Sequence, residues 1–189
     1  MERLDTRLDG PILIRPVVHG DERGFFHESY RHNVYESLGI PDEFVQDNHS
    51  RSAQGVVRGM HFQIGDGAGK LVRCARGAIL DVVVDLRRGS PTFGDREAFK
   101  LDDESFHQLY CPVGFAHGFC VLSEVADVIY KQTAYYRDEL ERGISYRDPD
   151  VGIDWPTGLD LQPSARDASA PLLREIEREL PFVYAPVLA

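Results

Sequence analysis

Three segments of the chain carry residue types that are suited to acid–base chemistry. Arg58-Gly-Met-His-Phe-Gln63 holds a histidine at position 61, and Lys70 follows soon after on what reads as the next strand. A second histidine, His117, ends the segment Pro112-Val-Gly-Phe-Ala-His117. Histidine is a base near neutral pH, and a neighbouring cation stabilises an oxyanion. This combination predicts the abstraction of a proton alpha to a carbonyl group.

The same residues are a poor set of metal ligands. The segment 112–117 matches P-x-G-x-x-H, part of the two-part histidine pattern of cupin barrels, but the first part of that pattern is broken. Gln63 stands where a second histidine is needed, no glutamate follows at the right spacing, and Lys70 adds a positive charge there. Since a divalent metal needs three or four nitrogen or oxygen ligands, we expect no metal and no cofactor. A non-catalytic cupin-type binding or metal-storage protein is the alternative from another class.

The segments that hold these residues are predicted to be short strands. Apolar or alternating runs recur between Gly, Pro and Asp, which predicts an all-β antiparallel sandwich or jelly roll. The predicted strands are 12–16, 25–30, 44–51, 55–63, 70–75, 78–85, 97–101, 106–111, 116–122 and 126–133. Short helices are predicted at the margins, over 33–38 and 171–180. No linker or repeat divides the chain, so residues 1–189 are expected to form one domain.

One predicted strand carries two carboxylates among apolar residues. In the run 78–86, Asp81 and Asp85 share a face with Ile79 and Val83, whereas the other face is wholly apolar. A dry core does not tolerate unpaired carboxylates. The carboxylate face is therefore either solvated, or it borders a polar barrel mouth where Asp81 orients a cationic or histidine partner.

Composition excludes several classes of function. The 189 residues carry a formal net charge of −10, which disfavours binding to nucleic acid or to an anionic membrane. No apolar run is long enough to span a bilayer, and the N-terminus shows no apolar signal region. The three cysteines form no CxxC pair, which favours reduced thiols, and Cys120 is expected to be buried. We expect a cytoplasmic protein whose anionic ligand, if it has one, meets a local basic pocket.

Several motifs in order resemble one enzyme family, the dTDP-4-dehydrorhamnose 3,5-epimerases. The resemblance runs from about residue 20 to 173. It rests on the segments 20–26, 44–50, 57–63, 69–74, 89–94, 112–119, 130–136 and 152–156. It implies a cupin-type double-stranded jelly roll with short flanking helices that binds no metal and works as a homodimer.

The resemblance also implies catalytic roles. His61 matches the general base, and Asp167 matches the carboxylate that holds the imidazole. Lys70 matches the cation near the carbon-4 oxygen, and Tyr130 matches the acid that returns a proton on the opposite face. For Asp167, a helix N-terminal cap is the structural alternative.

Ten further residues match substrate contacts of the family. Three of them reach the nucleotide from the partner subunit, and the others surround the base, the sugar and the diphosphate. They are Arg23, Phe26 and Glu28 from the partner, Gln46 and Asn48 near base and sugar, Arg58, Arg166 and Glu141 on the substrate, His117 on sugar or diphosphate, and Tyr136 stacked on thymine. Alternatives stay open: Arg23 as a surface residue, Gln46 and Asn48 on an exposed strand edge, Tyr135 in place of Tyr136, and both tyrosines in sheet packing.

The implied reaction is epimerisation at carbons 3 and 5 of dTDP-4-keto-6-deoxy-D-glucose, giving dTDP-4-keto-L-rhamnose through an enolate. The alternative within the family is a monofunctional 3- or 5-epimerase of a dTDP-4-keto-6-deoxyhexose in secondary metabolism. The intact segments 44–50 and 112–119 favour the double epimerase.

Overall fold

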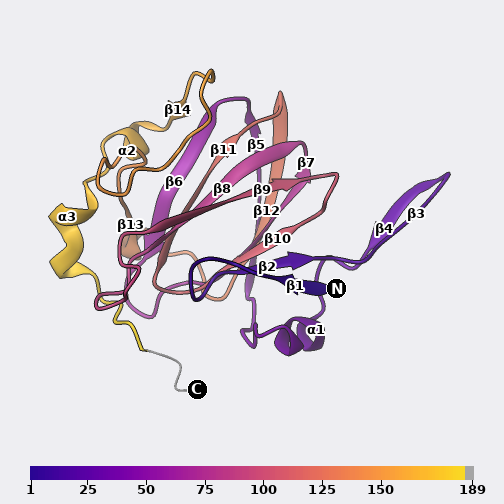
Figure 1. Cartoon of the computed structure of the whole chain (residues 1–189), viewed down its shortest axis with the longest axis horizontal. Helices are drawn as coiled ribbons and strands as arrows, with labels where there is room; N and C mark the ends of the chain where they lie inside the picture. Colours follow the sequence, from indigo (N-terminus) through magenta and orange to yellow (C-terminus); the bar gives the residue numbers. More distant parts are fainter. Residues whose placement is uncertain (186–189) are drawn as a thin grey trace.

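Two antiparallel sheets form the body of the protein, which a computed structural model describes for residues 1–185 (Figure 1). The first sheet has the order β1 (Glu2–Leu4), β2 (Ile12–Arg15), β10 (Gln108–Cys111), β7 (Lys70–Arg76), β12 (Val125–Gln132), β5 (Gln46–Ala53). The second has the order β13 (Glu141–Gly143), β6 (Val56–Gln63), β11 (Phe115–Val121), β8 (Ala78–Asp85), β9 (Arg96–Asp102), and β14 (Gln162–Pro163) pairs in parallel with β6. The predicted all-β jelly roll is confirmed.

The remaining elements lie outside the two sheets. They are the hairpin of β3 (Val18–Asp21) and β4 (Gly24–His27), and the helices α1 (His32–Ser37), α2 (Ala165–Ala168) and α3 (Leu173–Ile176). Figure 1 shows the β3–β4 hairpin projecting away from the sheets, while α2 and α3 lie against the second sheet. Within residues 1–185, no helix is long and apolar enough to cross a bilayer.

Strand alternation builds two apolar layers. On β8, Ile79 and Val83 point into the core between the sheets, while Val82 and Val84 point outward. The outward side chains do not meet water, because the C-terminal segment covers them with Leu173, Leu180 and Phe182 among others. The second sheet is therefore buried on both faces, which explains why β8 is apolar throughout apart from its two aspartates. All three cysteines, Cys120 included as predicted, are buried and free.

The C-terminal helix is shorter than its periodicity predicts. The expected helix over 171–180 is only α3, Leu173–Ile176, followed by a 3₁₀ turn at Glu177–Glu179. The backbone leaves helical geometry at Ile176 (φ −116°, ψ 0°). The spacing of three and four still serves packing, since Leu173 and Leu180 are both buried in the outer core.

Some strand ends also differ from the predicted ones. The predicted strand 106–111 begins only at Gln108, because Phe106 takes a positive φ of 55° after the turn at Asp102. The predicted strand 25–30 ends at His27, whose pair with Val18 is the last of the β3–β4 ladder. Strand β3 of the hairpin and the short strands β1, β13 and β14 were not predicted.

A bulge in β6 turns two polar residues inward. His61 pairs with His117 of β11, whereas Arg58 pairs with Phe119, so the register shifts between them. In a regular strand, residues 58 and 61 would point to opposite faces. The extra residue lets both Arg58 and His61 line the same cavity. Gly59 sits at this bulge with φ +142°, and a Cβ there would lie 2.5 Å from the Cα of Gly118.

We predict that Gly59→Ala lowers the free energy of unfolding by about 2–6 kcal/mol, because backbone strain and overpacking each cost about 1–3 kcal/mol. Urea denaturation measures the change. Gly24→Ala is the matched control: Gly24 also has positive φ (+122°), but no atom lies within 4 Å of the added Cβ. Equal destabilisation by both substitutions would show that the contact with Gly118 has no cost.

Candidate active site

A cavity of about 580 Å³ collects polar side chains from both sheets. His61 reaches it from β6 and His117 from β11, while Lys70 and Tyr130 reach it from β7 and β12 of the facing sheet. Six of the other predicted site residues either line it or adjoin it. Arg58, Tyr136, Glu141, Arg166 and Asp167 line it, and Asn48 lies on the neighbouring strand β5. We call it the substrate cavity.

A short hydrogen bond joins His61 to Asp167. The imidazole Nε2 lies 2.7 Å from Asp167 Oδ1. An ionised carboxylate only accepts hydrogen bonds, so Nε2 carries the hydrogen and the lone pair lies on Nδ1. Nδ1 in turn is 3.9 Å from Glu141 Oε1. Asp167 is not the helix cap: Ser164 caps α2, and its Oγ accepts from the Asp167 backbone N–H.

The position of Asp167 follows from local pairing. Strand β14 pairs with β6 at Val56 and Val57, which brings the chain to the second sheet directly before α2. Burial raises the pKa of Asp167, but the hydrogen bond and charge of His61, with the Gly59 N–H and Ser164, outweigh it, so the net pKa falls below 3.8. The carboxylate is therefore ionised at neutral pH and accepts the hydrogen bond from His61 Nε2.

The second histidine has its own carboxylate. His117 Nε2 lies 2.9 Å from both oxygens of Asp81, which is fully buried. The solvated face proposed for Asp81 and Asp85 is therefore wrong, and Asp81 orients a histidine as the alternative predicted. Asp85 is also fully buried and accepts hydrogen bonds from Arg87, Ser90 and Thr92.

Lys70 and Tyr130 stand in the first sheet on adjacent strands. Of the three lysines, Lys100 pairs with the buried Asp102 and Lys131 with the exposed Asp47, whereas buried Lys70 makes no ion pair within residues 1–185. Burial raises the pKa of Tyr130, the charge of Glu141 raises it further, and Arg58 opposes them. The phenol is thus protonated at neutral pH, and an uncompensated cation lies nearby.

Strand β5 adds amide and hydroxyl groups to the interior. Gln46 Nε2 donates to Asn48 Oδ1, and Gln46 Oε1 accepts from the backbone N–H of Tyr136. Asn48 Nδ2 and Ser50 Oγ are buried without a hydrogen-bond partner in the described chain. Ser50 lines the substrate cavity, and sequence reasoning missed it. Ser50 lies two residues after Asn48 and four after Gln46, so strand alternation places all three on one face, and this spacing could have identified it.

Tyr136 and not Tyr135 borders the substrate cavity. Tyr136 Oη donates to Asp138 Oδ1, while Tyr135 is 67 % exposed. Neither side chain packs in the sheet core, so the sheet-packing alternative is wrong for both. β5 is an edge strand of the first sheet, as the alternative proposed, but the side chains of Gln46 and Asn48 are half-buried and not exposed.

The structure does not bring Arg23, Phe26 and Glu28 to the cavity of their own chain. Arg23 lies in the β3–β4 hairpin and pairs with Asp21, and Phe26 of the same hairpin is 69 % exposed. Glu28 follows the hairpin and pairs with Arg31.

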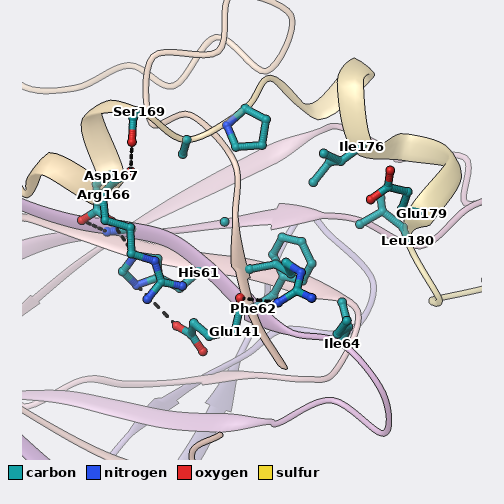
Figure 2. A pocket seen from close by; sticks show the side chains of 15 residues that line it. His61, Phe62, Ile64, Glu141, Arg166, Asp167, Ser169, Ile176, Glu179 and Leu180 are labelled. Atoms are coloured by element: carbon teal, nitrogen blue, oxygen red, sulfur yellow. Dashed lines mark hydrogen bonds and ion pairs between the residues drawn. The ribbon is translucent and has the colours of Figure 1, made fainter. Parts of the chain in front are cut away.

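A second cavity of about 370 Å³ reaches His61 and Asp167 from the C-terminal segment, and we call it the back cavity. Figure 2 shows His61, Asp167, Arg166 and Glu141 at one end and Ile176 and Leu180 at the other. Its lining also includes Phe62, Ile64, Ala170 and Glu179. His61, Glu141, Arg166 and Asp167 border both cavities.

A paired histidine, a buried lysine and a protonated tyrosine in one jelly-roll cavity define an acid–base enzyme of the cupin-type fold. Comparison with known proteins specifies the family. The family model described as dTDP-4-dehydrorhamnose 3,5-epimerase matches residues 5–175. The chain therefore belongs to the dTDP-4-dehydrorhamnose 3,5-epimerase family of isomerases.

Individual relatives agree with this assignment. The dTDP-4-dehydrorhamnose 3,5-epimerase of Pseudomonas aeruginosa is 52 % identical over 177 residues, which are 92 % of each chain. A crystal structure of a 3,5-epimerase from Legionella pneumophila in complex with dTDP-4-keto-L-rhamnose is 49 % identical, with a TM-score of 0.95 and coverage of 98 % of this chain and 99 % of that one. A dTDP-4-dehydrorhamnose 3-epimerase of Streptomyces niveus is 44 % identical, over 89 % of this chain and 82 % of its own.

We predict that His61→Ala raises the pKa of Asp167, because the substitution removes the largest contributions that lower it and leaves the effect of burial. Carbon-13 NMR titration of the labelled aspartate carboxyls measures the change. His117→Ala is the control, since His117 contacts Asp81 instead. An Asp167 pKa that does not rise in His61→Ala would contradict the pairing.

The pairing of His61 with Asp167 also determines the direction in which stability changes with pH. Because the folded pKa of Asp167 is depressed, its contribution to stability is present above the unfolded value and is lost as pH falls through the folded pKa. His61→Ala should reduce this acid-dependent loss of stability.

Proposed function

We propose that this protein epimerises carbons 3 and 5 of dTDP-4-keto-6-deoxy-D-glucose to give dTDP-4-keto-L-rhamnose. One observation carries the proposal: a histidine base and a tyrosine acid line one cavity from facing sheets, with a lysine beside the tyrosine strand. Inversion of a carbon needs a base on one side and an acid on the other. Family membership supplies the substrate class.

His61 removes the proton. The C–H bond next to the ketone breaks, its proton goes to Nδ1, and its electron pair moves to the carbon-4 oxygen to form an enolate. Asp167 holds the ring through Nε2 and stabilises the imidazolium that results. Lys70 brings its unpaired charge to the oxygen on which negative charge develops. The ketone already acidifies both positions, so no cofactor takes part.

Tyr130 completes the inversion. Its hydroxyl proton goes to the enolate carbon from the opposite face, and the carbon–oxygen double bond reforms. The raised pKa of Tyr130 keeps the phenol protonated at neutral pH, which is the state that an acid requires. Epimerisation at the second carbon repeats the same two transfers.

The rest of the cavity fits an anionic nucleotide. Arg58 and Arg166 give the local basic pocket that an acidic chain needs to bind a diphosphate, and His117 lies beside it. Tyr136 offers an aromatic face for thymine. The unpartnered Nδ2 of Asn48 and hydroxyl of Ser50 are free to bond base or sugar.

The single-centre epimerase is the second candidate, and the 44 % identity to a 3-epimerase from Streptomyces niveus favours keeping it in the test. Both reactions use the same base and acid, so they differ only in how many carbons are inverted.

The reaction is tested by proton NMR of dTDP-4-keto-6-deoxyglucose with the protein in D₂O. We expect solvent deuterium at both carbon 3 and carbon 5. His61→Asn and Tyr130→Phe should each slow turnover by about 10²–10⁴-fold, the contribution of a positioned base or acid. Exchange at one carbon selects the single-centre epimerase, and exchange at neither carbon overturns the proposal.

The protein is further proposed to act as a homodimer in the cytoplasm, with the β3–β4 hairpin of one subunit completing the cavity of the other. The hairpin projects from the body, and Phe26 is exposed on it (Figure 1). Phe25 packs on Phe106 of its own chain with ring centroids 4.5 Å apart, whereas Phe26 is 69 % exposed and is available to another subunit.

A mixing experiment tests the shared site. We predict that His61→Asn and the double variant Arg23→Ala/Phe26→Ala are each impaired alone, but regain about a quarter of wild-type activity after random reassembly, because half of the dimers are then mixed and each holds one intact site. Activity after unfolding and refolding the mixture is the measurement. No recovery would place the hairpin outside the partner's site.

A further inference from the structure

The back cavity reaches the base from behind. It touches Gly59, His61 and Asp167, and its wall continues over Ser169 and Ala170 to Ile176 and Leu180 of the C-terminal segment (Figure 2). Neither Lys70 nor Tyr130 lines it, so it does not belong to the acid side of the reaction. Its rim is open, because Arg142, Arg166 and Glu179 are exposed.

The proposed reaction leaves a proton imbalance after each inversion. The proton taken from carbon stays on His61, and the proton given to carbon comes from Tyr130. After one inversion, His61 therefore carries one proton too many, and Tyr130 one too few. A second inversion during the same binding event requires His61 to release its proton to water, and Tyr130 to take one up from water, while the sugar nucleotide is still bound.

The substrate cavity is a poor exit for that proton. A pocket of about 580 Å³ encloses most of the surface of a ligand that fills it. The bound sugar then separates Nδ1 from the solvent on that side. The back cavity keeps contact with His61 on the other side, since its lining residues are distinct apart from the wall that the two cavities share.

Glu141 connects the base to the back cavity. Its Oε1 lies 3.9 Å from His61 Nδ1, which one small side-chain movement or one water molecule can bridge. Its carboxylate borders both cavities. A carboxylate in this place can accept a proton from the imidazolium and pass it to water in the back cavity.

We propose that the back cavity is the route by which His61 exchanges its proton with solvent while the sugar nucleotide occupies the substrate cavity, with Glu141 as the relay. The inference rests on the proposed function. In the exit step the N–H bond of Nδ1 breaks, an O–H bond forms on Glu141, and that proton passes to water. His61 is then neutral again, and once the phenolate of Tyr130 has taken up a proton from water, both groups are ready for the second carbon.

The test uses substitutions that fill the back cavity with larger side chains and leave His61 and Asp167 unchanged. Ala170→Phe fills it from the loop after α2, and Ile176→Trp fills it from α3. Ala168→Phe is the matched control, because Ala168 is exposed on α2 and lines neither cavity. With enzyme in excess, rapid quenching and NMR follow the loss of the starting sugar and the appearance of the doubly inverted sugar as separate rates.

We expect the first inversion to keep its rate in both filled variants and the second to slow by about tenfold or more, since proton transfer through a positioned group contributes about 10²–10⁴-fold. The once-inverted sugar then accumulates. Ala168→Phe should behave as wild type. Glu141→Gln should likewise slow the second inversion more than the first, whereas equal losses would remove Glu141 from the route.

Two results overturn the back-cavity route. One is wild-type behaviour of both filled variants. The other is an equal loss of both inversions in them, which is the result of a displaced His61–Asp167 pair. Failure of the proposed function looks different, because the wild type itself then shows no inversion, or inversion of a single carbon.

Discussion

The hydrogen bond between His61 and Asp167 links parts of the chain that are over a hundred residues apart. It requires that the C-terminal segment reach the outer side of the second sheet, which it does through the pairing of β14 with β6 and the Ser164 cap of α2. It also requires the bulge at Gly59, because only the shifted register turns His61 into the cavity together with Arg58. The apolar layer of Leu173, Leu180 and Phe182 holds that segment in place.

The charge in the substrate cavity differs in sign from the net charge of the chain. With a net charge of −10, the protein repels an anionic substrate at long range. Inside, however, three of its buried carboxylates have a cationic or histidine partner: Asp81 with His117, Asp85 with Arg87, and Asp167 with His61. Lys70 is the buried cation that these carboxylates leave uncompensated within the described chain. The cavity therefore offers positive charge where the acidic surface does not.

The sequence predicted most of the fold because alternation and turn residues are local signals. The strand over 78–85 agrees with β8 residue for residue, since both of its faces are buried and Gly77 and Arg87 bound it. The helix over 171–180 was predicted too long, because apolar spacing reports burial of Leu173 and Leu180 and not the backbone at Ile176. Strand β3 of the hairpin was missed because all four of its residues are exposed and pack on no core within residues 1–185.

Site residues were predictable to the extent that motifs carried them. His61, Lys70, Tyr130 and Asp167 come together as the resemblance implied, but no local pattern fixes the contact between His61 and Asp167. Ser50 was overlooked because a lone serine in a strand carries no chemical signature until its hydroxyl is seen to lack a partner. The role of Asp81 was left open, since alternation identifies a face but not whether water or a histidine meets it.

The two-sheet architecture itself constrains the chemistry. In the proposed reaction, the base on β6 and the acid on β12 line the cavity from facing sheets, so each meets a different face of the bound sugar. Every reaction cycle therefore transfers a proton in one direction across the cavity, from the tyrosine side to the histidine side. A protein built this way needs a path by which that proton leaves the histidine for solvent. The second sheet, covered by a C-terminal segment that leaves a cavity behind His61, has the space for one.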